Sequence, residues 1–338
     1  MRLALAFGST LLAAANAFPD KASAEDIQTA LGDANSTSQS TPDPDGLVSF
    51  ADERFTNWRH AAQDHCLQPE ETPDSIGEDI LKTVTDYMRR SALTDRLFHD
   101  MEDSQFTICL AAPGTMPSHS FAIFMPEGDV AMIDPLRHEA NAVAFGLHEA
   151  RHGWQDVQGA FERMPTDSRQ DRFAALYMIE ADATAFSVAA AYQLKQQGEP
   201  GAWQALAIRV GYTEVVKAFE ASVSGIDEGR PLTDAELSRG MLAAYNAWFD
   251  NTNFPADFGA FQAERWAHYP DRSTDKTAEL RQIGQIIGQL PGTHDRQASS
   301  YIGPAQVAKA VAFANQLVPM KTPAPQEGGT APRVERQP

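Results

Sequence analysis

The sequence predicts an α+β fold that is mostly helical, with one small antiparallel sheet in the first half of the chain. Two patterns predict it. Apolar residues recur at helical spacing over most of the chain, whereas strand-like alternation and turn signals occur only between positions 106 and 133. The chain has 338 residues, 43% of them hydrophobic, so it can bury a sizeable core.

The chain is acidic, with a formal net charge of −19 from 46 acidic and 27 basic residues. A surface of that sign repels phosphate backbones and anionic lipid head groups. We therefore expect neither nucleic acid nor a membrane surface as a partner. The sequence does not indicate an oligomeric state.

The first 17 residues have the pattern of a secretory signal peptide. Arg2 precedes an uncharged run, Leu3 to Ala17, which ends in the small-residue site Ala15-Asn16-Ala17. The run is shorter than the roughly 20 apolar residues of a membrane span. No cysteine follows the site, so we expect no membrane anchor and predict a periplasmic or secreted protein. The alternative is an N-terminal helix of the core.

Two cysteines, Cys66 and Cys109, are present. In an export compartment they can form one disulfide. Because Cys109 lies in an apolar, strand-like run, a buried free thiol is an equally acceptable interpretation.

Composition and periodicity divide the chain into six parts. They are a signal peptide (1–17), a polar linker (18–47), a helical N-terminal part (48–104), a catalytic core (105–200), a helical C-terminal part (201–320) and a Pro/Gly-rich disordered tail (321–338).

The elements follow in order. Helices are predicted at 47–65, 76–88 and 93–101, and strands at 106–110, 118–125 and 130–133. Asp134 as N-cap and Pro135 in the first turn then predict a helix that runs to about Gly159. Further helices are predicted at 168–197, 201–224, 233–249, 258–268, 276–289 and 304–317.

The helix predicted after the sheet carries His148-Glu149-Ala150-Arg151-His152, an HExxH motif. At 3.6 residues per turn, His148 and His152 project from one face, so that both imidazoles can bind one zinc ion. Glu149 is offset by about 100° and can act as general base on a water held by the metal. The alternative is a pair of histidines that only pack one turn apart.

A zinc site needs a third protein ligand. The metzincin pattern is excluded because Gln155 and Gln158 stand at its later positions. The helix at 168–197 places Glu180 and Asp182 in apolar surroundings, where lone carboxylates are costly to bury. We predict Glu180 as the ligand. Asp182 points to another face and is expected to orient a ligand histidine from outside.

Several other roles stay open. Asp295, in Gly292-Thr293-His294-Asp295, is an alternative metal ligand, as is Asp182. A donor to the developing oxyanion is also needed, and the sequence does not rank the candidates Tyr177, Tyr192, Tyr301 and His294. Arg151 faces away from the histidines and is expected to form an ion pair or pack. His138 is expected at the surface.

The segments Leu147–Gln155 and Glu180–Ala183 resemble a bacterial metallopeptidase family of unassigned function, in which HExxH followed by Trp-Gln pairs with a downstream Glu-Ala-Asp-Ala. The resemblance covers residues 105–200. It implies a zincin-like, gluzincin-like fold, with His148, His152 and Glu180 as ligands and Glu149 as base. Gluzincins usually carry an aspartate four residues after the ligand glutamate, whereas here that position is Thr184.

The sequence as a whole predicts a zinc-dependent metallopeptidase that hydrolyses peptide bonds of peptides or proteins, with Zn²⁺ as cofactor and Glu149 activating the water. Two alternatives remain. One is a non-enzymatic zinc-binding or interaction protein, and the other is a zinc amidase that acts on cell-wall peptides. Substrate preference is not encoded in any motif that we identify.

Overall fold

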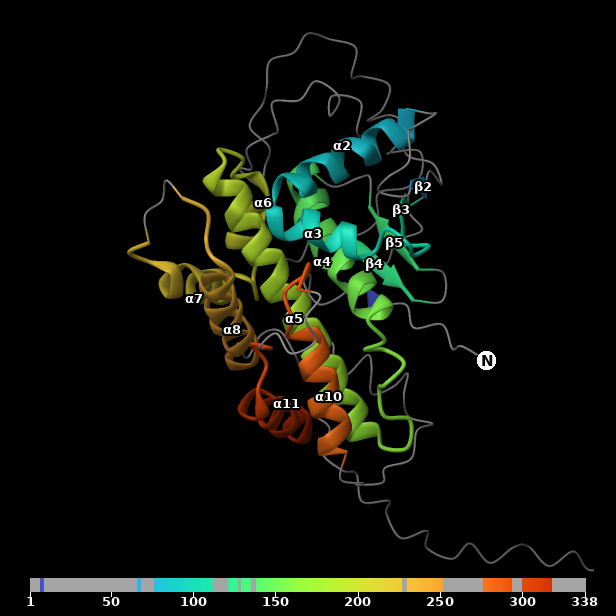
Figure 1. The fold of residues 1–338 in the computed structure, drawn as a ribbon, viewed down its shortest axis with the longest axis vertical. Coiled ribbons are helices and arrows are strands. Elements are labelled where there is room, and N and C mark those ends of the chain that lie inside the picture. The colour runs from blue at the N-terminus through green and yellow to red at the C-terminus, as the bar shows by residue number, and fades with distance from the viewer. Residues whose placement is uncertain are drawn as a thin grey trace, which may run out of the picture.

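The structure is a computed structural model that describes residues 7–8, 66–67, 76–111, 121–126, 129–134, 138–226, 230–251, 276–293 and 300–317. The linker, the tail, the helices predicted at 47–65 and 258–268, and all of the predicted signal peptide except Phe7–Gly8 lie outside these residues. Within them the chain is mostly helical with a small sheet, so the α+β class is confirmed (Figure 1).

Two helices precede the main part of the sheet. α2 spans Ile76–Arg90 and α3 spans Ala92–Asp100. Ser91 separates them and caps α3 by accepting a hydrogen bond from the Thr94 amide. Ser91 also donates to the Gln193 side chain on the long helix α5, at 2.8 Å. The start of α3 is thereby fixed to the centre of the fold.

The sheet has the strand order β1-β4-β5-β3-β2 among the described residues. Its strands are β1 (Phe7–Gly8), β2 (Cys66–Leu67), β3 (Thr107–Leu110), β4 (Ala122–Met125) and β5 (Val130–Ile133). The three predicted strands are present, but the sheet is mixed rather than purely antiparallel. β4 and β5 form the expected antiparallel hairpin, whereas β3 pairs with β5 in parallel. The antiparallel prediction is therefore wrong for β3, which lies on the opposite side of β5 from β4.

The two cysteines form a disulfide between facing positions of β2 and β3. The free-thiol interpretation of Cys109 is therefore wrong. Since 43 residues separate the two, the bond links a distant N-terminal segment to the centre of the sheet.

α4 (Glu139–Val157) and α5 (Arg169–Gln196) form the centre of the molecule. The N-cap of α4 is His138, whose side chain accepts from the Ala140 amide, and not Asp134 as predicted. His138 is also buried rather than at the surface. α5 is long and apolar enough to cross a membrane, but its most apolar stretch is entirely buried within the fold. We therefore describe it as a core helix.

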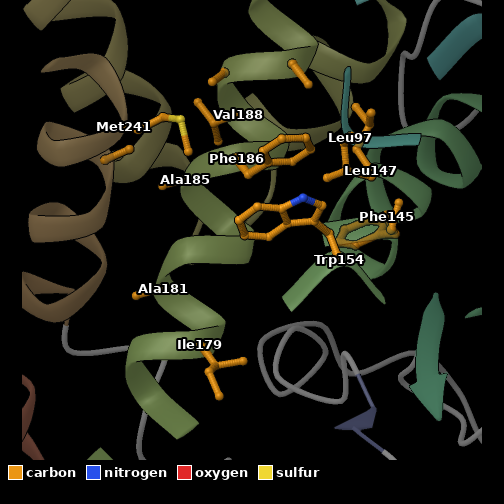
Figure 2. Packing of buried hydrophobic residues seen from close by; sticks show 14 of the residues in the cluster. Leu97, Phe145, Leu147, Trp154, Ile179, Ala181, Ala185, Phe186, Val188 and Met241 are labelled. Carbon is orange, nitrogen blue, oxygen red and sulfur yellow. The ribbon is translucent and has the colours of Figure 1, made fainter. Parts of the chain in front are cut away.

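Small residues on α5 allow neighbouring helices to approach closely. Figure 2 shows Ala181 and Ala185 on α5 and the Trp154 ring of α4 beside Phe186. Both rings are buried, and burying a large apolar side chain stabilises the folded state by roughly 1.5–3 kcal/mol. This packing sets how α4 and α5 lie against each other.

The remaining helices pack around α5 (Figure 1). They are α6 (Gly201–Ala207), α7 (Thr213–Val223), α8 (Asp234–Asp250), α10 (Thr277–Ile287) and α11 (Pro304–Leu317). The single helix predicted at 201–224 is wrong. It is broken between α6 and α7, where Gly211 has a φ of +93°, a conformation that glycine adopts without strain. This break directs Tyr212 towards α4.

Candidate metal centre

The crossing of α4 and α5 brings together His148, His152 and Glu180. The Nε2 atoms of the two histidines are 3.0 Å apart, and Glu180 Oε2 lies 3.3 Å from His148 Nε2 and 3.6 Å from His152 Nε2. A tetrahedral ion with bonds of about 2.0–2.1 Å has ligands about 3.3 Å apart. The three donor atoms therefore fit one metal ion of that size, and zinc is such an ion.

Helix geometry and packing explain why these three side chains meet. His148 and His152 are one turn apart on α4, and Glu180 lies in the middle of the buried face of α5. The relative exposure of these residues is only 3%, 1% and 3%. A carboxylate and two imidazoles removed from water in this way need a compensating partner for their lone pairs. A cation held among them supplies it.

The electrostatics of the cluster favour positive charge. Burial lowers the pKa of His152, but the Glu180 carboxylate, and to a lesser degree Glu149, outweigh it and raise this pKa to about 9. Conversely, burial raises the pKa of Glu180, while His152 and His148 outweigh it and bring this pKa to about 2. The carboxylate is thus ionised beside the two imidazoles, which is the form that ligates a metal.

Glu149 is fully buried next to the ligand cluster. Its charge acts on both His152 and Tyr212, which places the carboxylate within electrostatic reach of each. The helix offset that separates it from the two histidines leaves it beside the cluster rather than in it. This is the position that a general base requires.

The far side of each histidine ring is also held. His152 Nδ1 lies 2.8 Å from Gln155 Oε1. The ring of Phe124 on β4 stacks on the His152 ring, with 6.3 Å between the ring centroids. His148 Nδ1 lies 3.4 Å from the hydroxyl of Tyr212. The Thr184 hydroxyl, one turn after Glu180, lies near the Tyr212 hydroxyl and lowers its pKa slightly. Both Nε2 atoms are consequently directed into the cluster.

Burial raises the pKa of Tyr212 well above its usual value, and the neighbouring Thr184 hydroxyl offsets only part of this rise. The hydroxyl therefore keeps its proton at neutral pH. Because it lies on the Nδ1 side of His148, Tyr212 is placed to orient that ring.

Asp182 does not join the cluster. It forms a buried ion pair with Arg151 and accepts a hydrogen bond from Gln155 at 2.6 Å. The expected ion pair of Arg151 is therefore present. Of Glu180 and Asp182, only Glu180 reaches the histidines.

The three predicted oxyanion donors that the structure describes, Tyr177, Tyr192 and Tyr301, contact other groups. Tyr177 packs on Trp248 and Phe313 in the core, and Tyr192 packs on Trp203 and Phe219. Tyr301 donates to Asp182. His294, and also Asp295 as the alternative ligand, lie outside the described residues.

Sequence reasoning did not identify Tyr212 and treated Gln155 only as a departure from the metzincin pattern. No local signal points to Tyr212, because it lies in a break that was predicted to be helical. The spacing of Gln155, three residues after His152, places it on the same helix face and is the one signal that was available.

A groove of about 680 Å³ runs along α10 and the end of α4, lined by residues such as Gln158, Arg163 and Gln285. None of its lining residues belongs to the ligand cluster, and its two arginines are exposed. We assign it no part in the site.

Comparison with protein families gives one match. The model of a family described as "putative metallopeptidase family" matches residues 59–289, more than half of the chain. The matched range contains α4, α5 and Tyr212. Comparison with curated proteins and with solved structures finds no match.

Proposed function

Because the chain belongs to this metallopeptidase family, we propose that it is a zinc-dependent metallopeptidase that hydrolyses peptide bonds. His148, His152 and Glu180 hold the metal, and Glu149 is the general base. The observation that carries the proposal is the convergence of these three donor atoms at distances that suit one tetrahedral ion.

Each group of the site has a separate role in the proposed hydrolysis. When bound, zinc would polarise the scissile carbonyl and lower the pKa of a coordinated water towards about 7. Glu149 takes a proton from the attacking water and delivers it to the leaving amine. Tyr212 and Gln155 hold the two imidazole rings in place. Among the described residues three protein donors would hold the ion, which is the number found in catalytic rather than structural zinc sites.

Metal content and hydrolysis test the proposal together. Wild-type protein purified in zinc should hold one zinc ion per chain by mass spectrometry, and Glu180→Ala should hold none. Glu149→Gln should keep its zinc but cleave an unfolded protein substrate about 10²–10⁴ times more slowly. Glu139→Gln, the same substitution in the first turn of the same helix, is the matched control and should retain both properties.

The outcomes separate the rival functions. Zinc in wild type with no hydrolysis and no binding of a hydroxamate would support a closed, non-enzymatic zinc site. Cleavage of peptidoglycan fragments but not of unfolded protein would support a cell-wall amidase. Absence of stoichiometric zinc from the wild type would refute the proposal.

The N-terminal pattern adds a proposal about location. If residues 1–17 direct export, mature protein from the extracytoplasmic fraction should begin after Ala17, which N-terminal sequencing measures. Such a compartment also permits the disulfide between Cys66 and Cys109.

A further inference from the structure

The orientation of the Gln155 side chain follows from its partners. Its amide nitrogen donates to the Ile179 carbonyl at 3.0 Å and to Asp182 Oδ2 at 2.6 Å. A carbonyl and an ionised carboxylate accept hydrogen bonds but do not donate them. The nitrogen must therefore face these two groups, which leaves Oε1 directed at His152.

This orientation determines the protonation of the His152 ring. Gln155 Oε1 can only accept, and it lies 2.8 Å from His152 Nδ1. The proton must therefore be on Nδ1. In the neutral imidazole the lone pair is then on Nε2, the atom that faces His148 and Glu180.

Asp182 holds the Gln155 amide from a position that is itself fixed. Arg151 Nε lies 2.8 Å from Asp182 Oδ2, and a terminal nitrogen of the same guanidinium donates to the carbonyls of Ile287 and Gln289 at 2.5 and 3.0 Å. The Tyr301 hydroxyl donates to Asp182 Oδ1. Ile287, Gln289 and Tyr301 lie at the end of α10 and beyond it, 130 or more positions after the end of α4.

We propose that Gln155 is the positioning residue for His152, and that Asp182 acts through it, held by Arg151 and by the C-terminal residues Ile287, Gln289 and Tyr301. This inference rests on the proposed metal site. The C-terminal part of the chain thereby becomes part of the metal centre.

A purely structural role for these residues would change stability without changing metal affinity. Gln155, Asp182 and Arg151 are all fully buried, so any substitution alters packing to some degree. The discriminating measurement is therefore the zinc dissociation constant of protein that is shown to be folded, obtained by competition with a chelator.

Gln155→Met has a similar volume and no group that can accept from His152. Far-ultraviolet circular dichroism should show a folded protein, and its zinc dissociation constant should rise about 10–100-fold. Ser187→Ala is the control, because Ser187 is a buried polar residue of α5 whose hydroxyl donates to the Thr184 carbonyl of the same helix, and this variant should keep the wild-type constant. An unchanged constant for folded Gln155→Met would overturn the inference.

A double-mutant cycle tests whether Asp182 acts through Gln155. Asp182→Asn alone should weaken zinc binding, but in combination with Gln155→Met it should add little, because the link is already broken. Additive losses would mean that Asp182 acts by another route, against the proposal. If the variants do not fold, nitrogen-15 spectra of zinc-loaded wild type decide instead. The proposal requires a hydrogen-bonded proton on His152 Nδ1, and its absence refutes it.

The two proposals fail in different ways. Zinc retained by Glu180→Ala would contradict the proposed ligand set, whatever Gln155→Met does. Zinc lost from Glu180→Ala but bound normally by Gln155→Met would leave the metallopeptidase intact and remove only the positioning role.

Discussion

Arg151 on α4 and Asp182 on α5 form an ion pair in which neither side chain has any solvent exposure. Arg151 Nε lies 2.8 Å from Asp182 Oδ2, and its guanidinium also stacks over the Trp154 ring at 4.0 Å. The pair joins the two helices that carry the proposed metal ligands. A change in the strength of this pair should therefore affect both the stability of the fold and the position of the proposed ligands.

Removing one partner of this pair should be severely destabilising. Arg151→Met leaves the Asp182 charge buried and is expected to lower the free energy of unfolding by about 3–5 kcal/mol, measured by urea titration. The exposed pair Lys195–Glu220 supplies the comparison, since Lys195→Met should cost less than about 1 kcal/mol. Equal effects at the two sites would contradict the assignment of Arg151–Asp182 as a buried pair.

Gly153 has no room for a side chain. A Cβ there would lie 2.5 Å from two carbons of the Phe106 ring, whereas at Gly146 it would meet the flexible Met88 sulfur at 3.1 Å. Alanine gains about 1 kcal/mol in a helix over glycine, but overpacking costs about 1–3 kcal/mol. We expect Gly153→Ala to lower the melting temperature, and Gly146→Ala to leave it equal or higher. If Gly153→Ala were as stable as Gly146→Ala, the Phe106 ring would have to move aside at no cost in stability, which would contradict the prediction.

The disulfide should make a large contribution to stability. Closing a loop of 43 residues is worth about 4 kcal/mol in the chain-entropy model. The double variant Cys66→Ala, Cys109→Ala should therefore melt at a markedly lower temperature than oxidised wild type. Oxidised protein unfolded without reductant should show no free thiol with a thiol reagent. Two free thiols per chain would contradict the bond.

α8 begins with a capping box. Thr233 accepts from the Glu236 amide, and the Glu236 side chain accepts from the Thr233 amide. Thr233→Ala should cost about 1 kcal/mol in the free energy of unfolding. For Glu236→Gln, by contrast, we predict a loss of stability whose size depends on pH.

The sign of that pH dependence follows from the pKa of Glu236, which hydrogen bonds from Arg230 first, and then from Thr233, hold well below its usual value. A depressed carboxylate stabilises the fold fully above its unfolded pKa, and the contribution is lost as pH falls through the folded pKa. The melting temperatures of wild type and Glu236→Gln should therefore differ at pH 6 and converge as the pH drops below 4. A difference in melting temperature that grows as the pH falls would contradict this prediction.

Most helices could be predicted because their signals are local. The helix predicted at 168–197 is observed as Arg169–Gln196, and that at 304–317 as Pro304–Leu317. The prediction failed where the determinant is not local. The parallel pairing of β3 with β5 depends on which strand occupies the middle of the sheet, which no local pattern gives. The break between α6 and α7 is different, because Gly211, with its positive φ, is a local signal that the prediction did not use.

The sequence by itself determined the spacing of His148 and His152 on one helix face, because helical periodicity is a property of adjacent residues. It also favoured an acid from the next long helix as the third ligand, with Asp295 as an alternative outside that helix. Only the tertiary structure decided that Glu180 meets the histidines while Asp182 pairs with Arg151, and that Gln155 and Tyr212 hold the two rings. Those assignments depend on how α4 crosses α5 and on where Ile287, Gln289 and Tyr301 lie against the two helices. They are contacts between distant segments, and no local pattern encodes them.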